Sequence, residues 1–461
     1  MEIRDALYGS VSLDGGEARV LDSRYFQRLR HIRQLGLSEY SYPSATHNRY
    51  IHSVGAMHVA SRALETIFGL SSDESAGDGE LSHRNKRRAS WEVALQRLPR
   101  SAYLRFRSLV RLAALLHDIG HGPLSHALES AMPSRESLWA GSTPVSGVRT
   151  EGQANHEDYT LKIILDSDLT GILNEVGRKY GFRAEHVAAL IDPSVQASSD
   201  PYLERIEGAK IDFRPLLQQL ISSELDCDRM DYLQRDSFFA GVNYGRYDYD
   251  WLSRNLTASV QGEACFLALH HRALYAFEDF LISRFHMFLM VYFHHKSIVY
   301  EEMFKRYFET SGDEYPIPSD LTKYLECVDS QLFAKLSHSK NPWAERITAR
   351  KPYQLLCETQ SGIPAQTEAQ AESMANFQKI ILQLKNKSIP FIETSTKGEL
   401  SKYRPDQGPI IYVRYDDLFS QPQFIPLREC TDLFKRYQEQ RFINRIYVDP
   451  QFIFQAREMK I

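Results

Sequence analysis

The stretch HDIGHGPLSH, which runs from His117 to His126, decides how the rest of the sequence is interpreted. His117 and Asp118 place a nitrogen and an oxygen ligand side by side, a pair that suits a borderline divalent metal ion. The apolar run before them, residues 109–116, predicts a buried helix that would hold both ligands rigidly. Glycines and a proline inside the stretch then interrupt that helix, so that His121 and His126 can fold back towards the metal. A His-Asp pair alone is a weak signal, but four ionisable groups around this break predict a metal site.

Length and composition bound the class of protein. The chain has 461 residues, of which 43% are hydrophobic and 25% charged, as in an ordinary globular protein, and its net charge of −4 argues against a generally basic nucleic-acid coat. The five cysteines are scattered with no CxxC pair, which argues against a disulfide framework and a thiolate zinc site. The first residues carry no apolar signal core, and no uncharged apolar run is long enough to span a membrane. We therefore expect a soluble, cytoplasmic protein.

Helical periodicity dominates and predicts a mainly α fold with a smaller α+β region at the C-terminus. We expect a catalytic core over residues 1–310 and the α+β region over residues 311–461. Two polar stretches interrupt the core, a surface insertion at about residues 69–100 and a loop at about residues 131–155. The segment 274–308 predicts one long aromatic helix that is apolar on nearly every face and so runs through the fold or across an interface.

Two further segments bring polar residues into helices. HNRYIHSVG, residues 47–55, predicts a loop that feeds a helix with His52 in its first turn. In ELDCDRMDYLQRDSFFAGVNYG, residues 224–245, three polar side chains lie four residues apart and would form one stripe on a helix, namely Asp228, Tyr232 and Asp236. Taken alone, this stripe also fits an exposed helix face.

These segments are stronger evidence for a functional site when they are considered together. A metal that activates a water or polarises a phosphoryl oxygen needs three or four protein ligands and an open position. Three separate helices can supply two histidines and two carboxylates, namely His52, His117, Asp118 and Asp228. Because two of the ligands are imidazoles, the set favours Fe, Mn or Zn over Mg, although Mg can accompany nucleotide phosphates.

Other polar residues fit the remaining roles at such a site. Imidazoles titrate near neutral pH, so three histidines are candidates for proton transfer and Glu129 can orient one of them: His121, His126 and His156. Cations that could clamp a polyphosphate are Arg49, Arg229, Arg284 and His294. Tyr232 and Asp236 could receive sugar hydroxyls, and Tyr292 could stack on a base or sugar. The alternative is that these residues are core histidines and surface charges. For any single residue, that alternative stays open.

Several strings together resemble one known family. The order of His52, His117-Asp118 and Asp228 looks like the H…HD…D pattern of HD-domain metal phosphohydrolases. FQRLRHIRQLG, HNRYIHSVG, HDIGHGPLSH, NHED, DCDRMDYLQRDSFFAGV and VYFHHKSIVYEEMF are similar to segments of the deoxynucleoside triphosphate (dNTP) triphosphohydrolases. That family includes bacterial enzymes and a vertebrate enzyme that joins a sterile-alpha-motif domain to an HD domain. The likeness covers residues 1–310 in detail and implies an HD-domain helical core.

The resemblance also implies roles for single residues. It makes metal ligands of His52, His117, Asp118 and Asp228, and assigns in-line attack and proton delivery to His121, His126, Glu129 and His156. It assigns phosphate contacts to Arg49, Arg229 and Arg284, the deoxyribose pocket to Tyr232, Asp236, Gln34 and Leu35, and the base and phosphate pocket to Tyr292 and His294. The vertebrate enzyme has a lysine at the position of Arg229, and the insertion at residues 69–100 has no counterpart.

Together, these expectations predict that the protein hydrolyses a dNTP to a deoxynucleoside and inorganic triphosphate. A phosphodiesterase or nucleotidase reaction is the alternative enzyme, and a nucleic-acid-binding regulator with a structural site, supported only by basic residues 84–88, is the alternative class. The apolar segment 274–308 suits a homo-oligomer, with a tetramer favoured. By resemblance, an activating nucleotide could bind at Asp22, Gln27, Arg28 and Arg30, where pattern alone indicates an ordinary surface helix.

Overall fold

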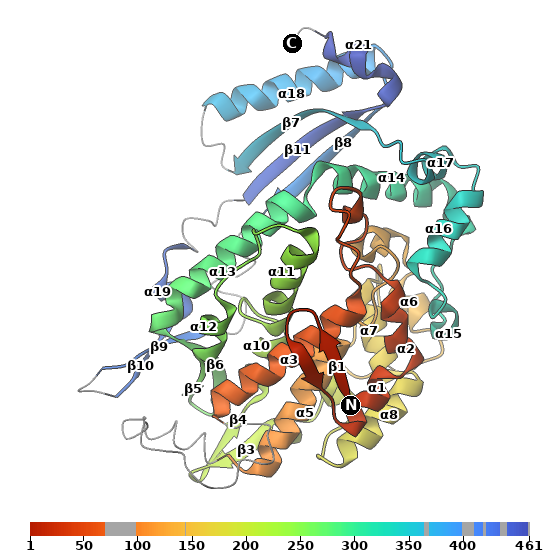
Figure 1. The fold of residues 1–461 in the computed structure, drawn as a ribbon. Coiled ribbons are helices and arrows are strands. Elements are labelled where there is room, and N and C mark those ends of the chain that lie inside the picture. Colours follow the sequence, from red (N-terminus) through yellow and green to blue (C-terminus); the bar gives the residue numbers. More distant parts are fainter. Residues whose placement is uncertain are drawn as a thin grey trace.

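The computed structural model describes residues 1–69, 98–142, 144–363, 368–398, 410–417, 421–433 and 440–459. The predicted insertion at residues 69–100 therefore falls almost wholly outside the described residues. Within them the fold is mainly α-helical with a smaller α+β part at the C-terminus, which confirms the predicted fold class. Figure 1 shows a large helical body with a smaller sheet-and-helix unit at the top, next to the C-terminus.

The chain begins with a hairpin and then builds the centre of the helical body. The hairpin and the short helices after it are β1 (Glu2–Asp5), β2 (Gly9–Ser12), α1 (Gly15–Leu21) and α2 (Arg24–Gln27). Three helices form the centre, in which α3 packs against both α5 and α11: α3 (Arg49–Phe68), α5 (Arg100–Leu116) and α11 (Cys227–Ala240). Smaller helices surround them: α6 (Arg135–Leu138), α7 (His156–Leu165), α8 (Asp168–Arg178), α9 (Ala184–Ile191), α10 (Arg214–Ile221) and α12 (Tyr249–Arg254).

The central helices begin and end where local chemistry predicts. The Asn48 side chain accepts a hydrogen bond from the amide of Ile51 at the start of α3, and Gly69 ends that helix in a left-handed conformation. The Asp226 carboxylate accepts in the same way from the amide of Arg229 at the start of α11. The buried helix predicted before His117 is α5, whose last two turns are enclosed in the hydrophobic core.

A six-stranded sheet lies beside the helical body and contains strands from distant parts of the chain. Its main path runs β10-β9-β6-β4-β3, and β5 pairs with β6. The bounds are β3 (Leu203–Ile206), β4 (Ala209–Asp212), β5 (Leu256–Gln261), β6 (Ala264–His270), β9 (Tyr412–Tyr415) and β10 (Gln423–Pro426). Because β9 pairs in parallel with β6, the C-terminal part of the chain returns to complete the sheet of the core.

The smaller unit has its own hydrophobic core. It is a three-stranded antiparallel sheet in the order β7-β11-β8, and α18 packs against it through side chains such as Phe377 and Leu384. The elements are β7 (Gln354–Ile363), α18 (Glu368–Asn386), β8 (Phe391–Gly398), β11 (Gln440–Val448) and α21 (Ile453–Arg457). Connecting helices are α15 (Leu321–Tyr324), α16 (Asp329–His338), α17 (Pro342–Thr348) and α19 (Leu427–Cys430).

Two predicted helices differ from those observed. The surface helix expected around Asp22, Gln27, Arg28 and Arg30 is only α2 and one 3₁₀ segment, Arg28–His31, because the next residues pair with the loop before α3 through an Arg33–Asn48 bridge. The single helix expected over residues 274–308 is two helices, α13 (Leu274–Met287) and α14 (His295–Ser311). A wider π-helical turn, Phe288–Tyr292, separates them and turns Tyr292 towards α11, where its hydroxyl meets Asp236.

No helix within the described ranges is both long enough and apolar enough to cross a membrane.

Candidate metal centre

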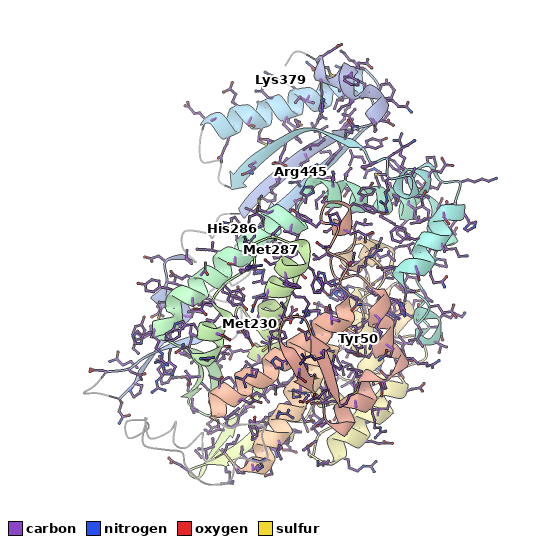
Figure 2. The ribbon with its side chains drawn as sticks, viewed as in Figure 1. Tyr50, Met230, His286, Met287, Lys379 and Arg445 are labelled. Carbon is purple, nitrogen blue, oxygen red and sulfur yellow. The ribbon has the colours of Figure 1, made fainter. Side chains whose placement is uncertain are left out.

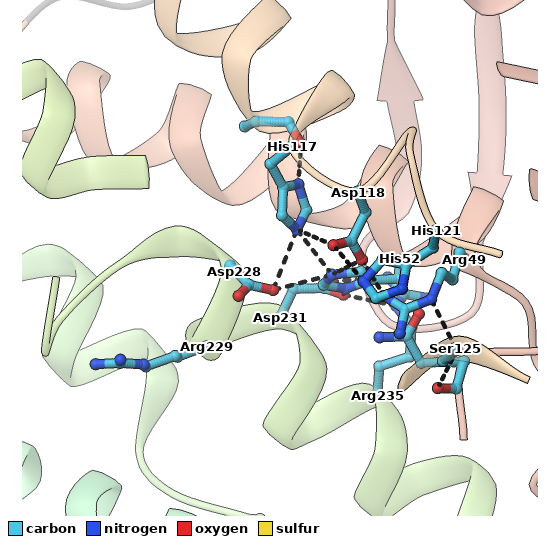
Figure 3. A network of polar contacts seen from close by, with 12 residues as sticks. Arg49, His52, His117, Asp118, His121, Ser125, Asp228, Arg229, Asp231 and Arg235 are labelled. Atoms are coloured by element: carbon cyan, nitrogen blue, oxygen red, sulfur yellow. Dashed lines mark hydrogen bonds and ion pairs between the residues drawn. The ribbon is translucent and has the colours of Figure 1, made fainter. Parts of the chain in front are cut away.

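Four side chains from three helices converge at the centre of the helical body. Figure 3 shows His52 of α3, His117 and Asp118 at the end of α5, and Asp228 of α11 directed towards one another. The His52 Nε2 atom lies 3.0 Å from Asp228 Oδ1, 3.3 Å from His117 Nε2 and 3.6 Å from Asp118 Oδ2. His117 Nε2 lies 3.3 Å from the same Asp228 oxygen and 3.5 Å from Asp118 Oδ1.

The hydrogen bonds of the two imidazoles indicate what this cluster can hold. His52 Nδ1 lies 2.8 Å from Asp231 Oδ2, and His117 Nδ1 lies 2.8 Å from the Ala114 carbonyl oxygen. Because both partners only accept, each Nδ1 donates its proton, so each Nε2 is the atom that would offer its lone pair to a metal ion among the carboxylate oxygens. His52, His117 and Asp118 form a group that could hold a metal ion, and Asp228 Oδ1 lies close to both imidazoles, so the donor set of two imidazoles and two carboxylates fits a divalent metal.

The pKa values of the cluster residues also agree with the binding of a metal ion. Burial alone would lower the pKa of His52, but hydrogen bonds to Asp228 and Asp231 raise it to about 10. Burial alone would raise the pKa of Asp118, but the charges of Arg49 and His117 lower it well below its usual range. The carboxylates are therefore ionised and the site favours a positive charge, which a metal ion supplies when it is bound.

A chain of buried ion pairs begins at the Nδ1 side of His52. It was not predicted from the sequence. The Asp231 carboxylate accepts from His52 and also from the Arg235 guanidinium, at 2.8 and 2.9 Å. Arg235 reaches Asp5 of the N-terminal hairpin at 2.9 Å. A Cβ on Gly55 would lie 2.1 Å from Asp231 Oδ1, so glycine is required where α3 approaches α11. The spacing of Asp228, Asp231 and Arg235 on one helical face is the signal that could have revealed this chain.

We expect Asp231→Asn to weaken the metal affinity by about 10- to 100-fold, because the amide no longer fixes the His52 tautomer. Metal retention during titration with a chelator measures the effect, and Asp250→Asn, an exposed residue of α12, is the matched control. Equal retention by the Asp231 variant and by the wild-type protein would contradict the role of this carboxylate.

Arg49 connects the metal ligands to the turn that follows them. Its Nη1 atom forms a short ion pair with Asp118 Oδ2, and its Nε donates to Ser125 Oγ at 3.0 Å. Arg49 is buried, with 4% of the residue exposed, beside the cluster. The predicted phosphate contact at this position stays a prediction.

A second group of ionisable residues lies beside the ligands. The rings of His121 and His156 stack with centroids 3.8 Å apart, and His121 Nε2 lies 3.3 Å from Asp118 Oδ1. The Glu129 carboxylate forms a short hydrogen bond with His156 Nδ1, which fixes that imidazole at the start of α7. Burial, with the charges of Arg49 and His156, lowers the pKa of His121 well below its usual value. The side chain of His126 lies outside the described residues.

The residues predicted for the sugar and base also meet. Asp236 Oδ2 accepts from the Tyr292 hydroxyl at 2.7 Å, and its Oδ1 lies 2.7 Å from His47 Nε2. The Tyr232 ring lies edge-on to both His52 and Tyr292, with centroids 6.5 and 6.2 Å away. Tyr232, Asp236 and Tyr292 therefore form one wall beside the ligands, and His47 is a member that the sequence interpretation missed.

The other predicted substrate residues have their own contacts. His294 Nδ1 lies 3.1 Å from Ser41 Oγ, and the pKa of His294 is lowered to about 4 by burial and the neighbouring His295. Arg284 is buried, with its guanidinium over the Phe288 ring. The backbone of Gln34 donates to the His47 carbonyl, and Leu35 packs against the main hydrophobic core.

Arg229 is directed away from the ligands (Figure 3). Its guanidinium binds the Ser223 carbonyl and lies 3.3 Å from Glu224 and 3.6 Å from Asp226. These partners occupy the side chain, so a phosphate contact by Arg229 would require it to leave them.

The four residues predicted for an activator do not share one environment. Arg30 stacks on Tyr50, which Figure 2 marks in the helical body, and donates to Gln27. Asp22 lies at the end of α1. Arg28 is buried, and its two terminal nitrogens donate to the His121 carbonyl at 2.7 and 2.6 Å. Arg28 is thus tied to the backbone of the turn that follows Asp118, and the activator role of the four residues stays a prediction.

The comparisons with known proteins agree with this geometry. Residues 49–236 match the HD domain and residues 248–381 match the HD associated region. An uncharacterized protein of Bacillus subtilis is 30% identical over 276 residues, which are 60% of this chain and 47% of that protein. The deoxynucleoside triphosphate triphosphohydrolase SAMHD1 of Xenopus laevis is 28% identical over 255 residues, 53% of this chain and 35% of that protein. The matches span less than two thirds of the length of these curated relatives.

A solved structure extends the likeness to the whole chain. A hypothetical protein from Aquifex aeolicus superposes with a TM-score of 0.69 and 26% identity, over 99% of this chain and 98% of that chain. The fold and the two-histidine, two-carboxylate cluster thus define an HD-domain protein with a site suited to a divalent metal. Residues 49–236 thus carry an HD domain, and the chain is similar to proteins named deoxynucleoside triphosphate triphosphohydrolase, at 24–28% identity.

Proposed function

We propose that this protein hydrolyses dNTPs to the deoxynucleoside and inorganic triphosphate. The observation that carries the proposal is the pairing of the metal cluster with the His121–His156–Glu129 group on one side and the Asp236–Tyr292 wall on the other. Likeness to proteins named deoxynucleoside triphosphate triphosphohydrolase supports the same substrate. We further propose that the protein works in the cytoplasm, since its five cysteines are free thiols.

Each group has a chemical task in this reaction. A metal held by His52, His117, Asp118 and Asp228 would supply Lewis-acid polarisation of the α-phosphate, and we propose Fe, Mn or Zn as the ion. Arg49 would bind the phosphate oxygens beside Asp118. His156, oriented by Glu129, would move a proton between the attacking water or the leaving 5′ oxygen and the solvent, and His126 is the second candidate for that transfer.

Incubation with a panel of dNTPs and NTPs in the presence of Mn²⁺, with products resolved by anion exchange, tests the proposal. We expect a deoxynucleoside and intact triphosphate. Release of pyrophosphate with a nucleoside monophosphate would instead favour the phosphodiesterase or nucleotidase reaction. Turnover of no nucleotide by metal-loaded protein would exclude the proposal.

We expect ribonucleotides to be poor substrates, with kcat/KM at least about 100-fold below that of the matching dNTP. Tyr232 and Asp236 are held in place by Tyr292 and His47, and with Leu35 they would leave no room for a 2′ hydroxyl. Tyr232→Ala should narrow this difference, while Tyr275→Ala, an exposed residue of α13, should leave it unchanged. Equal rates for ATP and dATP with the wild-type protein would show that the sugar pocket is misassigned.

We also propose a homo-oligomer, most simply a tetramer, with activation by a second nucleotide. A cavity of about 580 Å³ is lined by Arg30, Arg33 and Arg350 together with Glu39 and Asp329, and its three guanidinium groups are the feature that favours an anionic ligand. Arg30→Ala should weaken activation at unchanged metal content, and the exposed Arg24 in the same segment offers the control Arg24→Ala. Sedimentation of a strictly monomeric, fully active enzyme with hyperbolic kinetics in mixed nucleotides would rule this out.

A further inference from the structure

The turn after the metal ligands has an unusual backbone. Leu124 and Ser125 are consecutive non-glycine residues with positive φ, at 55° and 58°. Side chains with a Cβ rarely adopt this conformation, and it persists only where the surroundings hold it. The groups that hold this turn therefore influence the geometry of the neighbouring site.

Asp329, the first residue of α16, contacts the turn directly. Its Oδ1 accepts from the backbone amide of Leu124 at 2.9 Å, and its Oδ2 accepts from the backbone amide of Arg33 at 3.0 Å. The carboxylate is buried, with 6% of the residue exposed. One side chain thus joins two segments that are far apart in the sequence. Gly36, three residues after Arg33, is close enough that a Cβ there would lie 3.2 Å from the Leu124 carbonyl oxygen.

The Leu124–Ser125 turn is also connected to the metal cluster. Ser125 Oγ donates to the Arg33 carbonyl at 3.0 Å and accepts from Arg49 Nε at 3.0 Å. Arg49 is paired with the ligand Asp118. Asp329 itself forms no hydrogen bond with Arg49 or Asp118 in the described structure, so its hydrogen bonds act on them through the turn, and its charge also attracts that of Arg49 directly.

We propose that Asp329, from the HD-associated region, is a positioning residue that fixes the Leu124–Ser125 turn and thereby holds Arg49 in place beside Asp118. The kinetic part of this inference rests on the proposed dNTP hydrolysis, whereas its structural part does not. The residues that shape the site then include part of α16, which lies beyond residue 236, the end of the HD match.

Asp329→Ala and Asp329→Asn test the proposal as a graded pair, because alanine removes both acceptors and asparagine keeps one carbonyl oxygen. Hydrogen–deuterium exchange should quicken at the amides of Leu124 and Arg33, more in the alanine variant than in the asparagine variant. We expect kcat to fall by about 10- to 100-fold in Asp329→Ala, the range for losing hydrogen bonds to a charged group, with KM changed little. The metal content should equal that of the wild type.

Asp320→Asn is the matched control, because Asp320 is an exposed residue whose carboxylate likewise accepts a backbone amide, that of Lys323 at 2.9 Å. It should alter neither exchange at the turn nor kcat. Unchanged exchange at Leu124 in Asp329→Ala would overturn the proposal, as would a loss of metal in proportion to the loss of activity. Failure of the wild-type protein to hydrolyse any dNTP would overturn the proposed function alone, since exchange and metal content still measure the role of Asp329.

Discussion

Asp228→Ala is expected to abolish both metal binding and hydrolysis, with a loss of rate of about 10³-fold or more. Asp228 Oδ1 is the one oxygen that lies close to both ligand imidazoles, at 3.0 Å from His52 Nε2 and 3.3 Å from His117 Nε2. Removing it leaves two imidazoles and Asp118, which is already neutralised by Arg49. Metal analysis of the purified variant together with the dNTP assay measures the result.

The helical fold should survive this change, because the Asp228 side chain is one-third exposed, at 33%, and forms its ion pairs with His52 and His117 of the cluster. Circular dichroism checks the fold, and Asp168→Ala, an exposed acidic residue in the first turn of α8, serves as the control. His117→Ala should reproduce the loss from the opposite side of the cluster. Wild-type metal occupancy in the Asp228 variant would refute the assigned ligand set.

His156→Ala is expected to lower the rate by about 10²–10⁴-fold, the usual range for a positioned acid or base. The imidazole is fixed by Glu129 and stacked on His121, so no other described side chain occupies the same place. Unlike Asp228→Ala, this variant should keep its metal and still release intact triphosphate. Single-turnover kinetics with product analysis separates the two effects.

His338→Ala provides the control for the loss of an imidazole, because His338 is exposed on α16. Glu129→Gln should give a smaller decrease than His156→Ala, since it removes only the group that orients the ring. A wild-type rate in the His156 variant would indicate that His126 transfers the proton instead. The same measurement on His126→Ala tests that assignment.

Much of the local structure follows from the sequence. The helix that begins at Arg49 with His52 in its first turn and the buried helix before His117 were both predicted, because capping residues and apolar runs act over a few neighbours. The mainly α fold class is confirmed for the same reason. The proposed ligand, substrate and activator roles stay predictions.

Other features depend on contacts that a single segment cannot encode. The π-helical turn at Phe288–Tyr292 interrupts a segment that reads as one apolar helix. The predicted stripe on α11 includes Asp228, which meets His52, but it left out Asp231 and, one turn on, Arg235, which also lie on the side of α11 that faces His52. Strand β9 joins the sheet of the core although it lies in the C-terminal region, which no pattern in residues 410–417 indicates.

By itself the sequence determined which chemical groups this protein has and which helices carry them, since ligand type and helix propensity are properties of residues and their near neighbours. The tertiary structure alone decided how those groups are paired. It placed Asp231 behind His52, Arg28 on the His121 carbonyl and Asp329 on the Leu124 turn. These pairs join residues far apart in the chain, and each forms only because packing of the surrounding helices buries both partners and leaves them no water to bind.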